Sequence, residues 1–264
     1  MKDKVIVITG ASGGIGASLA ELVGRRGARP VLVARRAKEL DAVAGRSGPH
    51  ALPVVGDVTR RADVVRVFEQ AVARFGHVDV WVNNAGRGIS RAPSELTDED
   101  FDDMMLVNVK AVMYGMQTAL PHFRDRRQGQ IINVSSLLGR LPLVTFRAAY
   151  CASKHAMNSL TASFRMELGG AFPDIHIGTV HPGVVATDFG RNALHGGMDS
   201  RKFPGAQSPE EVAEVIAGVI DRPRADVYTR PDGQKMVIAY YAAEDMGAAE
   251  RQPPFGGAPP PFRP

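Results

Sequence analysis

The sequence predicts a single α/β domain built on one Rossmann-type, doubly wound parallel β-sheet of about seven strands, flanked by helices. Two observations lead to this fold class. Short, β-branched apolar runs recur along the chain, and they are nearly continuous rather than alternating, which is typical of parallel strands buried on both faces. Stretches of helical length, with apolar residues at spacings of three and four, separate these runs.

The expected strands and helices alternate along the chain. The runs predicted as strands are residues 5–8, 31–33, 54–55, 78–82, 131–134, 175–180 and, more weakly, 227–228. The stretches predicted as helices are residues 14–27, 60–74, 98–126, 148–169 and 208–221. The last helix has a clear start at Ser208, which is a capping residue followed by a proline and two acids.

The composition limits the classes of protein to consider. With 264 residues, 44% of them hydrophobic, the chain suits one domain, expected over residues 1–251, followed by a proline-rich extended tail at 252–264. The net charge of +4 is too small to predict nucleic-acid binding. The longest uncharged stretch, residues 5–20, is glycine-rich and too short for a membrane span.

The cysteine and histidine content also carries information. The single cysteine, Cys151, cannot form an internal disulfide, and no secretory signal is visible, so a cytoplasmic protein is expected. His155 and His181 have no cluster of further ligands at a suitable spacing, and no metal site is therefore expected.

A glycine-rich turn joins the first expected strand to the first expected helix. Backbone N–H groups at such a helix start, with the positive end of the helix dipole, attract a pyrophosphate. Gly10 permits the tight turn, Gly14 lets the backbone approach the phosphates, and Gly16 allows the helix to pack closely on the strand. The turn therefore predicts a dinucleotide cofactor, bound by Gly10, Ser12, Gly13, Gly14, Ile15 and Gly16.

The end of the second expected strand indicates which dinucleotide binds. Proteins that bind NAD usually have an acid there, which holds the ribose 2′-hydroxyl. Here Ala34 occupies that place, Arg35 and Arg36 follow, and the nearest acids lie further on. Because a guanidinium pairs well with a 2′-phosphate, the sequence predicts NADP(H); two solvated arginines at a helix start are the alternative.

A tyrosine and a lysine four residues apart fall in the helix expected at 148–169. Their spacing places Tyr150 and Lys154 on one helical face, where a fixed ammonium would lower the pKa of the phenol and suit it to acid–base catalysis. Upstream, a buried strand delivers Ser135 and Ser136 at its carboxyl end, the edge at which open α/β sheets bind ligands.

Several motifs in a fixed order resemble those of the short-chain dehydrogenase/reductases, in the single-domain branch of that family. The motifs are TGASGGIG at residues 9–16, Asp57-Val58, NNAG at residues 83–86, Asn108, Ser136, Tyr150 with Lys154, and His181-Pro182-Gly183 through Thr187. The resemblance covers roughly residues 4–230. It implies an oxidoreductase that interconverts a ketone or aldehyde and its alcohol, with NADP(H) carrying the hydride.

The resemblance also implies a role for each matching residue. Tyr150 is the expected general acid in reduction and base in oxidation, Lys154 lowers its pKa and binds the nicotinamide ribose, and Ser136 polarises the carbonyl. Asn108 is expected to hold a water in a proton relay. Outside the glycine turn, the expected cofactor contacts are Arg35, Arg36, Asp57, Val58, Asn84, Ala85, Gly86, Tyr150, Lys154, Pro182, Gly183, Val185 and Thr187.

The spacing between serine and tyrosine departs from the family. Ser136 and Tyr150 are 14 residues apart, one more than the resemblance leads us to expect. The extra residue falls in 137–149, a predicted loop that can absorb an insertion. Ser136 is the predicted catalytic serine, and Ser135 is the alternative.

Substrate choice is expected to depend on two loops, residues 137–149 and 188–207. The second loop carries Phe189, Leu194, Met198 and Phe203 among several glycines, which indicates a lid over a hydrophobic carbonyl compound. The long helices resemble the subunit interface of the family, so a homodimer or homotetramer is expected. A catalytically silent NADP-binding sensor, which would bind nucleotide without turnover, is the alternative function.

Overall fold

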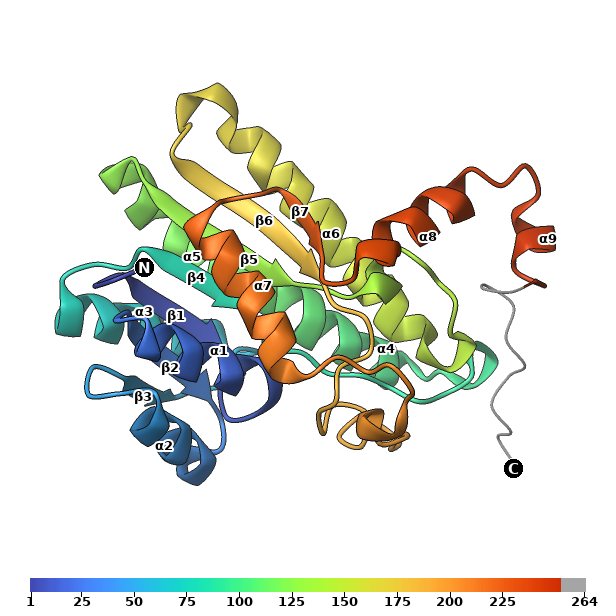
Figure 1. The fold of residues 1–264 in the computed structure, drawn as a ribbon, viewed down its shortest axis with the longest axis horizontal. Helices are drawn as coiled ribbons and strands as arrows, with labels where there is room; N and C mark the ends of the chain where they lie inside the picture. The colour runs from blue at the N-terminus through green and yellow to red at the C-terminus, as the bar shows by residue number, and fades with distance from the viewer. Residues whose placement is uncertain (253–264) are drawn as a thin grey trace.

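Seven strands form one parallel sheet in the order β3-β2-β1-β4-β5-β6-β7 in the computed structural model, which describes residues 1–252 (Figure 1). The strands are β1 (Val5–Thr9), β2 (Arg29–Ala34), β3 (Leu52–Val55), β4 (Val80–Asn83), β5 (Gly129–Val134), β6 (Ile175–His181) and β7 (Asp226–Tyr228). The predicted fold class and all seven predicted strands are confirmed. The order of the strands reverses at β1 and β4, and such a switch point is where open α/β sheets bind their ligands.

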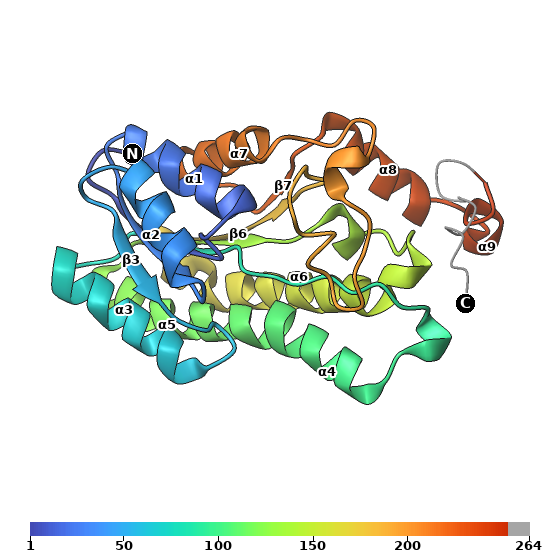
Figure 2. The same cartoon turned by 90° about the horizontal axis from the view of Figure 1, so that it is seen from below.

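Helices cover both faces of the sheet, as Figure 2 shows from below. They are α1 (Gly14–Arg25), α2 (Ala37–Arg46), α3 (Arg61–Phe75), α4 (Asp98–Met105), α5 (Ala111–Arg126), α6 (Ala148–Leu168), α7 (Pro209–Asp221), α8 (Pro231–Tyr241) and α9 (Met246–Ala249). One face of the sheet packs against α1, α2 and α7, and the other packs against α3, α5 and α6.

The alternation of side chains along β1 explains why this strand is apolar throughout. Ile6 and Ile8 belong to the core beneath α1, α2 and α7, whereas Val5 and Val7 belong to the core beneath α3, α5 and α6. All four side chains are fully buried. A strand covered on both faces needs apolar residues at successive positions, which is the pattern that predicted it.

The long helix predicted over residues 98–126 is interrupted. Residues Leu106–Lys110 form a π-helical turn between α4 and α5, so the chain stays helical but gains one residue in that turn. Asn108 lies inside this turn and is fully buried. Local π-helical turns inside α-helices are frequent at functional sites, because they change the direction in which a side chain points.

Helices α8 and α9, which follow β7, were not predicted. Within α8 the buried residues are Gly233 and Tyr240, whereas Ile238 and Tyr241 are exposed. The helix therefore lacks the broad apolar stripe from which an amphipathic helix is predicted. Most of the proline-rich tail predicted at 252–264 lies outside the described residues. None of the helices described for residues 1–252 combines the length and apolar character needed to cross a membrane.

Candidate active site

The sequence-predicted site residues come together at one edge of the sheet. The parallel strands all end at this edge, so the segments that follow β1, β2, β3, β4, β5 and β6 reach it in turn. These segments carry the glycine turn, Arg35 and Arg36, Asp57 and Val58, Asn84 to Gly86, Ser136, and Pro182 to Thr187. Helix α6, which packs beside β6 and bonds to the end of β5, adds Tyr150 and Lys154.

The glycine turn has the backbone geometry that its sequence demands. Gly10 and Gly14 have φ angles of 70° and 56°, in the left-handed region that favours glycine. A Cβ at Gly16 would lie 2.5 Å from the carbonyl oxygen of Gly10, so no larger residue fits there. No side chain caps α1 at its first residues, which leaves the backbone N–H groups at the helix start free to bind an anion.

The turns after β1 and β4 are tied together by side chains at the switch point. The Thr9 hydroxyl accepts hydrogen bonds from the backbone N–H groups of Asn84 (3.0 Å) and Ala85 (3.1 Å). In return, the Asn84 side-chain amide donates to the Thr9 carbonyl at 2.9 Å. These bonds fix the turn after β4, including Gly86, directly against the glycine turn.

The two arginines after β2 differ in their surroundings. Arg36 donates from Nη2 to the Ser12 hydroxyl (3.0 Å) and the Ser12 carbonyl (3.3 Å), so its guanidinium lies across the glycine turn. Glu39, one helical turn later, also pairs with Arg36 at 3.4 Å. The side chain of Arg35 is exposed and makes no hydrogen bond or ion pair within residues 1–252.

The segment after β3 lies beside a small apolar cavity. Asp57 and Val58 line it, together with Val33 and Trp81. The Asp57 carboxylate accepts hydrogen bonds from the Thr59 backbone N–H (3.0 Å) and hydroxyl (2.8 Å). Asp57 therefore shapes the turn that leads to α3 in addition to lining the cavity.

Tyr150 and Ser136 face each other across the gap between β5 and α6. Burial raises the pKa of Tyr150 to about 12, although the sequence predicted that the Lys154 ammonium would lower it; the effect that lowers it most is a hydrogen bond with the Ser136 side chain. The Ser136 hydroxyl also accepts a hydrogen bond from the Leu138 N–H at 3.1 Å, which fixes its position. The Ser135 hydroxyl is buried without a hydrogen-bond partner and lies near Gly139 and Asn158 instead.

Lys154 is buried beneath Tyr150. Its ammonium donates to the Val134 carbonyl at 2.9 Å and lies 5.8 Å from the centre of the Tyr150 ring. Burial lowers the pKa of Lys154 to about 8, because the charged form loses its hydration in the interior. A lysine that titrates near neutral pH can both hold and release a proton at this position.

Both the oxygen and the nitrogen of the Asn108 side-chain amide form hydrogen bonds. Its Oδ1 accepts from the Arg87 N–H at 3.0 Å, and its Nδ2 donates to the Arg87 carbonyl (2.9 Å) and the Ser153 hydroxyl (3.1 Å). A Cβ at Gly86 would lie 3.2 Å from Asn108 Oδ1 and 3.6 Å from Lys154 Nζ. Asn108 and Lys154 thus flank the same glycine, and the absence of a side chain at Gly86 lets both polar groups approach the backbone.

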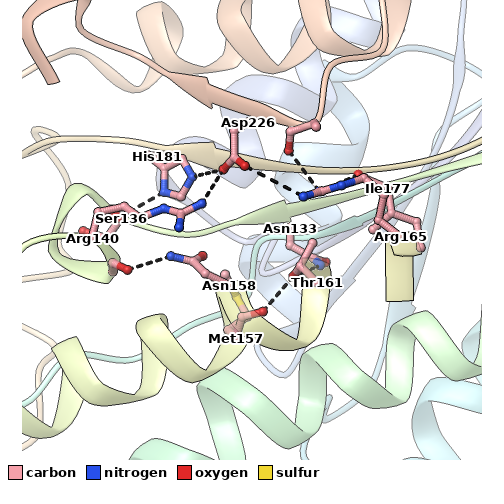
Figure 3. A network of polar contacts seen from close by, with 12 residues as sticks. Asn133, Ser136, Arg140, Met157, Asn158, Thr161, Arg165, Ile177, His181 and Asp226 are labelled. Atoms are coloured by element: carbon pink, nitrogen blue, oxygen red, sulfur yellow. Dashed lines mark hydrogen bonds and ion pairs between the residues drawn. The ribbon is translucent and has the colours of Figure 1, made fainter. Parts of the chain in front are cut away.

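A chain of buried amides and hydroxyls ties α6 to the sheet (Figure 3). Asn83 donates to Asn133 Oδ1 at 2.8 Å, and Asn133 donates to the Thr161 hydroxyl at 2.9 Å. Asn158 donates to the Gly139 carbonyl at 2.7 Å. Because these bonds are buried, they hold Tyr150 and Lys154 in register with the end of β5.

A second network lies behind Ser136, and two of its residues, Arg140 and Asp226, had no place in the predicted site or its motifs. His181 Nε2 is 2.6 Å from Asp226 Oδ1, and His181 Nδ1 is 3.3 Å from the Ser136 carbonyl oxygen (Figure 3). Arg140 pairs with Asp226 at 2.8 Å. Asp226 is 90 residues from Ser136 in the sequence, and no local pattern links the two.

The segment after β6 closes over the site. The Leu137 N–H donates to the Pro182 carbonyl at 2.8 Å, and Val185 pairs with Gln207 in a short bridge. Gly183 lies between them, and a Cβ at Gly14 would lie 3.1 Å from Thr187. In the predicted lid, Phe189 packs edge-on against Tyr150 with ring centres 5.6 Å apart.

Comparison with known proteins places this geometry in a family. A sequence model of the family described as short chain dehydrogenase matches residues 4–196. The chain belongs to the short-chain dehydrogenase/reductase family. Its relative YxnA from Bacillus subtilis, called an uncharacterized oxidoreductase, is 35% identical over 239 residues, which are 86% of this chain and 65% of YxnA. The chain thus spans about two-thirds of that relative's length.

Solved short-chain dehydrogenase/reductase structures resemble the whole described fold. One from Burkholderia phymatum, in complex with NAD, has a TM-score of 0.84 and 26% identity, and covers 94% of this chain and 95% of its own. An alcohol dehydrogenase from Thermococcus sibiricus, complexed with 5-hydroxy-NADP, has a TM-score of 0.75 and 29% identity, and covers 86% of this chain and 96% of its own. These relatives carry nicotinamide cofactors of both kinds.

The residues of this chain fit such a cofactor. The uncapped start of α1 suits a pyrophosphate, and Asp57 and Val58 follow β3 further along the same edge of the sheet. Within residues 1–252, no group of three His, Cys, Asp or Glu side chains could hold a metal ion.

Proposed function

We propose that this short-chain dehydrogenase/reductase is an NADP(H)-dependent oxidoreductase that interconverts a ketone or aldehyde and its alcohol. The observation that carries the proposal is the position of Tyr150, buried between Ser136 and Lys154 at the edge of the sheet that also presents the glycine turn. A phenol, a hydroxyl and an ammonium at one point can together donate a proton to a carbonyl oxygen and stabilise its developing charge.

The residues proposed to hold the cofactor are those that lie at the carboxyl edge of the sheet. The glycine turn, with Ser12, Gly13 and Ile15, would hold the pyrophosphate, and Asp57 and Val58 would line the adenine end. Asn84, Ala85 and Gly86 would form the floor, and Pro182, Gly183, Val185 and Thr187 would seat the nicotinamide end. When bound, the nicotinamide supplies the hydride.

The protonation state of Tyr150 suits carbonyl reduction. With its pKa raised to about 12 by burial, the phenol carries its proton at neutral pH and can give it to the carbonyl oxygen as the hydride reaches the carbon. Ser136 donates a second hydrogen bond to the same oxygen. The bond that breaks is the phenol O–H, and the product is the alcohol with a tyrosinate left behind.

The tyrosinate must then recover its proton. Lys154, whose pKa burial lowers to about 8, can pass a proton to Tyr150 and be reprotonated near neutral pH. We assign Asn108 to the same relay, since its amide flanks Gly86 opposite the Lys154 ammonium. In the oxidation direction the proton travels the opposite way.

The preference for NADP(H) rests on Arg36. Its guanidinium lies across the glycine turn on Ser12, and Ala34 stands where an acid would hold an unmodified ribose. Arg35, exposed beside it, is the second candidate for the 2′-phosphate.

Location and assembly are further parts of this proposal. The single cysteine, Cys151, is free and buried, which suits the reducing cytoplasm. Helices α5 and α6 would form the interface of a homodimer or homotetramer, and Met166 on α6 is a large exposed apolar side chain there. The domain would extend over residues 1–251.

The experiment that tests the function is nucleotide binding followed by turnover. We expect NADPH to bind, by the fluorescence of the bound nicotinamide, and its absorbance to fall when apolar ketones or aldehydes are added. Tight binding with no consumption, either on carbonyls or with alcohols and NADP, would favour a silent sensor instead. Failure to bind either nucleotide would contradict the whole proposal.

A further inference from the structure

Arg147 is half-buried, and its guanidinium has unmet hydrogen-bonding capacity. It ends the short 3-10 turn Thr145–Arg147, directly before α6, in the loop that holds the extra residue between Ser136 and Tyr150. Its Nη1 atom is buried and has no hydrogen-bond partner. Among residues 1–252, no Asp or Glu forms an ion pair with it, and burial lowers its pKa.

A second unpaired polar group lies beside the first. The Ser90 hydroxyl is buried and also has no hydrogen-bond partner. A Cβ at Gly197 would lie 2.4 Å from the Gly190 carbonyl oxygen, 3.1 Å from Ser90 Oγ and 3.2 Å from Arg147 Nη2, so Ser90 and the second nitrogen of the guanidinium both lie against the same turn of the lid. Gly197 belongs to the lid, and only a residue without a side chain lets the lid backbone lie this close to both groups.

The same cluster adjoins the proposed acid. A Cβ at Gly88 would lie 2.5 Å from Arg147 Nη1 and 3.0 Å from Phe189, the residue that packs against Tyr150. Only a glycine at position 88 lets the guanidinium and Phe189 lie this close to the backbone. The positive charge of Arg147 is also close enough to Tyr150 to favour the phenolate. The guanidinium, Phe189 and Tyr150 are therefore successive neighbours under the lid.

Buried donors without acceptors cost stability, so a structure that leaves Ser90 Oγ and Arg147 Nη1 unpaired within one cluster under the lid needs a reason for doing so. We infer that Arg147 and Ser90 bind a carboxylate of the substrate, so that the compound reduced at Tyr150 is an oxo acid with an apolar body. This inference rests on the proposed function. One guanidinium and one hydroxyl match the single charge and planar oxygens of a carboxylate better than a phosphate dianion.

The lid supplies the apolar part of this recognition. Phe189, Met198 and Phe203 are large apolar side chains exposed on this segment. A substrate that displaces Phe189 from Tyr150 would meet the phenol at its carbonyl, the guanidinium at its carboxylate, and these side chains along its hydrocarbon. The site would thereby select amphiphilic oxo acids over neutral ketones.

The test measures binding of simple carboxylates to the protein saturated with NADPH. Butanoate, hexanoate and octanoate would be compared with their amides, in the full chain, in Arg147→Met and in the surface control Arg222→Met. We expect the best carboxylate to bind on the order of tenfold or more tightly than its amide. This difference should disappear in Arg147→Met and persist in Arg222→Met, with NADPH binding retained in both.

Turnover provides the second arm. Medium-chain oxo acids would be compared with their methyl esters as substrates, and the preference for the acid should appear mainly in KM. Equal binding of acids and amides, or a preference that survives Arg147→Met, would overturn the inference while leaving carbonyl reduction intact. A carboxylate preference without turnover of any carbonyl would instead contradict the proposed function and leave the carboxylate site standing.

Discussion

Lys154 directs its ammonium to the carbonyl oxygen of Val134, 2.9 Å away, at the last residue of β5. Ser136 follows β5, and the last residue of the same strand binds the lysine that lies next to Tyr150. This single hydrogen bond couples the end of the sheet to α6 and holds a buried cation where stability alone would not place one. Function and stability conflict at this position.

Replacement of Lys154 by an apolar residue should abolish activity and raise the stability of the protein. A lysine whose pKa is about 8 in the folded protein and 10.5 in the unfolded chain disfavours folding at pH 7 by on the order of 3 kcal/mol. Lys154→Met removes this cost but loses a hydrogen bond worth about 1 kcal/mol. We expect the variant to be inactive yet more stable to urea at pH 7.

The difference in stability between Lys154→Met and wild type should depend on pH. Between pH 8 and 10.5 the unfolded chain binds the proton that the folded protein has lost, so wild-type stability rises with pH over this interval. The advantage of Lys154→Met should therefore shrink as the pH is raised from 8 to 10.5. A variant that is less stable than wild type at pH 7, or a constant difference across this range, would contradict the account.

The arginines after β2 provide a matched pair for cofactor selection. Because Arg36 lies across the glycine turn and Arg35 points to solvent, Arg36→Ala should weaken NADPH binding by on the order of tenfold or more and change NADH binding little. Arg35→Ala should have the smaller effect. The affinities of each variant for NADPH and NADH would be measured by fluorescence titration. If Arg36→Ala lost affinity for NADPH and NADH equally, Arg36 would have no role in recognition of the 2′-phosphate.

The Asp226 carboxylate should affect the stability of the protein at low pH. Burial acts to raise the pKa of Asp226, but hydrogen bonds from His181 and Arg140 outweigh it, so the pKa lies below its usual value. A carboxyl with a lowered folded pKa stabilises the protein above its unfolded pKa and loses that contribution as the pH falls. Wild type should thus lose more stability than Asp226→Asn from roughly pH 5 downward.

The exposed Asp174 is the control for that experiment. Asp174→Asn should follow the wild-type curve at every pH, measured by urea unfolding. Since His181 contacts both Asp226 and the Ser136 carbonyl, Asp226→Asn should also lower kcat while leaving NADPH binding unchanged. A variant with the wild-type pH curve and full kcat would show that the network does not position Ser136.

Much of the fold was readable from the sequence because it depends on local patterns. Continuous apolar runs identify strands covered on both faces, and the Ser208 to Glu211 segment forms the capping box that its residue types suggest. The π-helical turn around Asn108 was not readable, because residues 98–126 have a helical pattern throughout and the inserted residue is accommodated by packing against α6.

The site was predictable only where its residues form motifs. The glycine turn and the pair Tyr150 and Lys154 have fixed spacings, which backbone geometry explains. Arg147 and Asp226 have no such signal, since their importance comes from neighbours brought together by the fold: a lid glycine for one, a buried histidine for the other. The choice between Arg35 and Arg36 likewise depends on which side chain turns toward Ser12.

The most direct test of the central claim follows the transferred hydrogen. NADPH that carries deuterium at its reactive position would be incubated with the best carbonyl substrate and either wild type or Tyr150→Phe. The account predicts one deuterium on the carbinol carbon of the product, with Tyr150→Phe slower by on the order of 100-fold or more but still binding NADPH. An unlabelled alcohol, or a Tyr150→Phe variant with near wild-type rates, would contradict it.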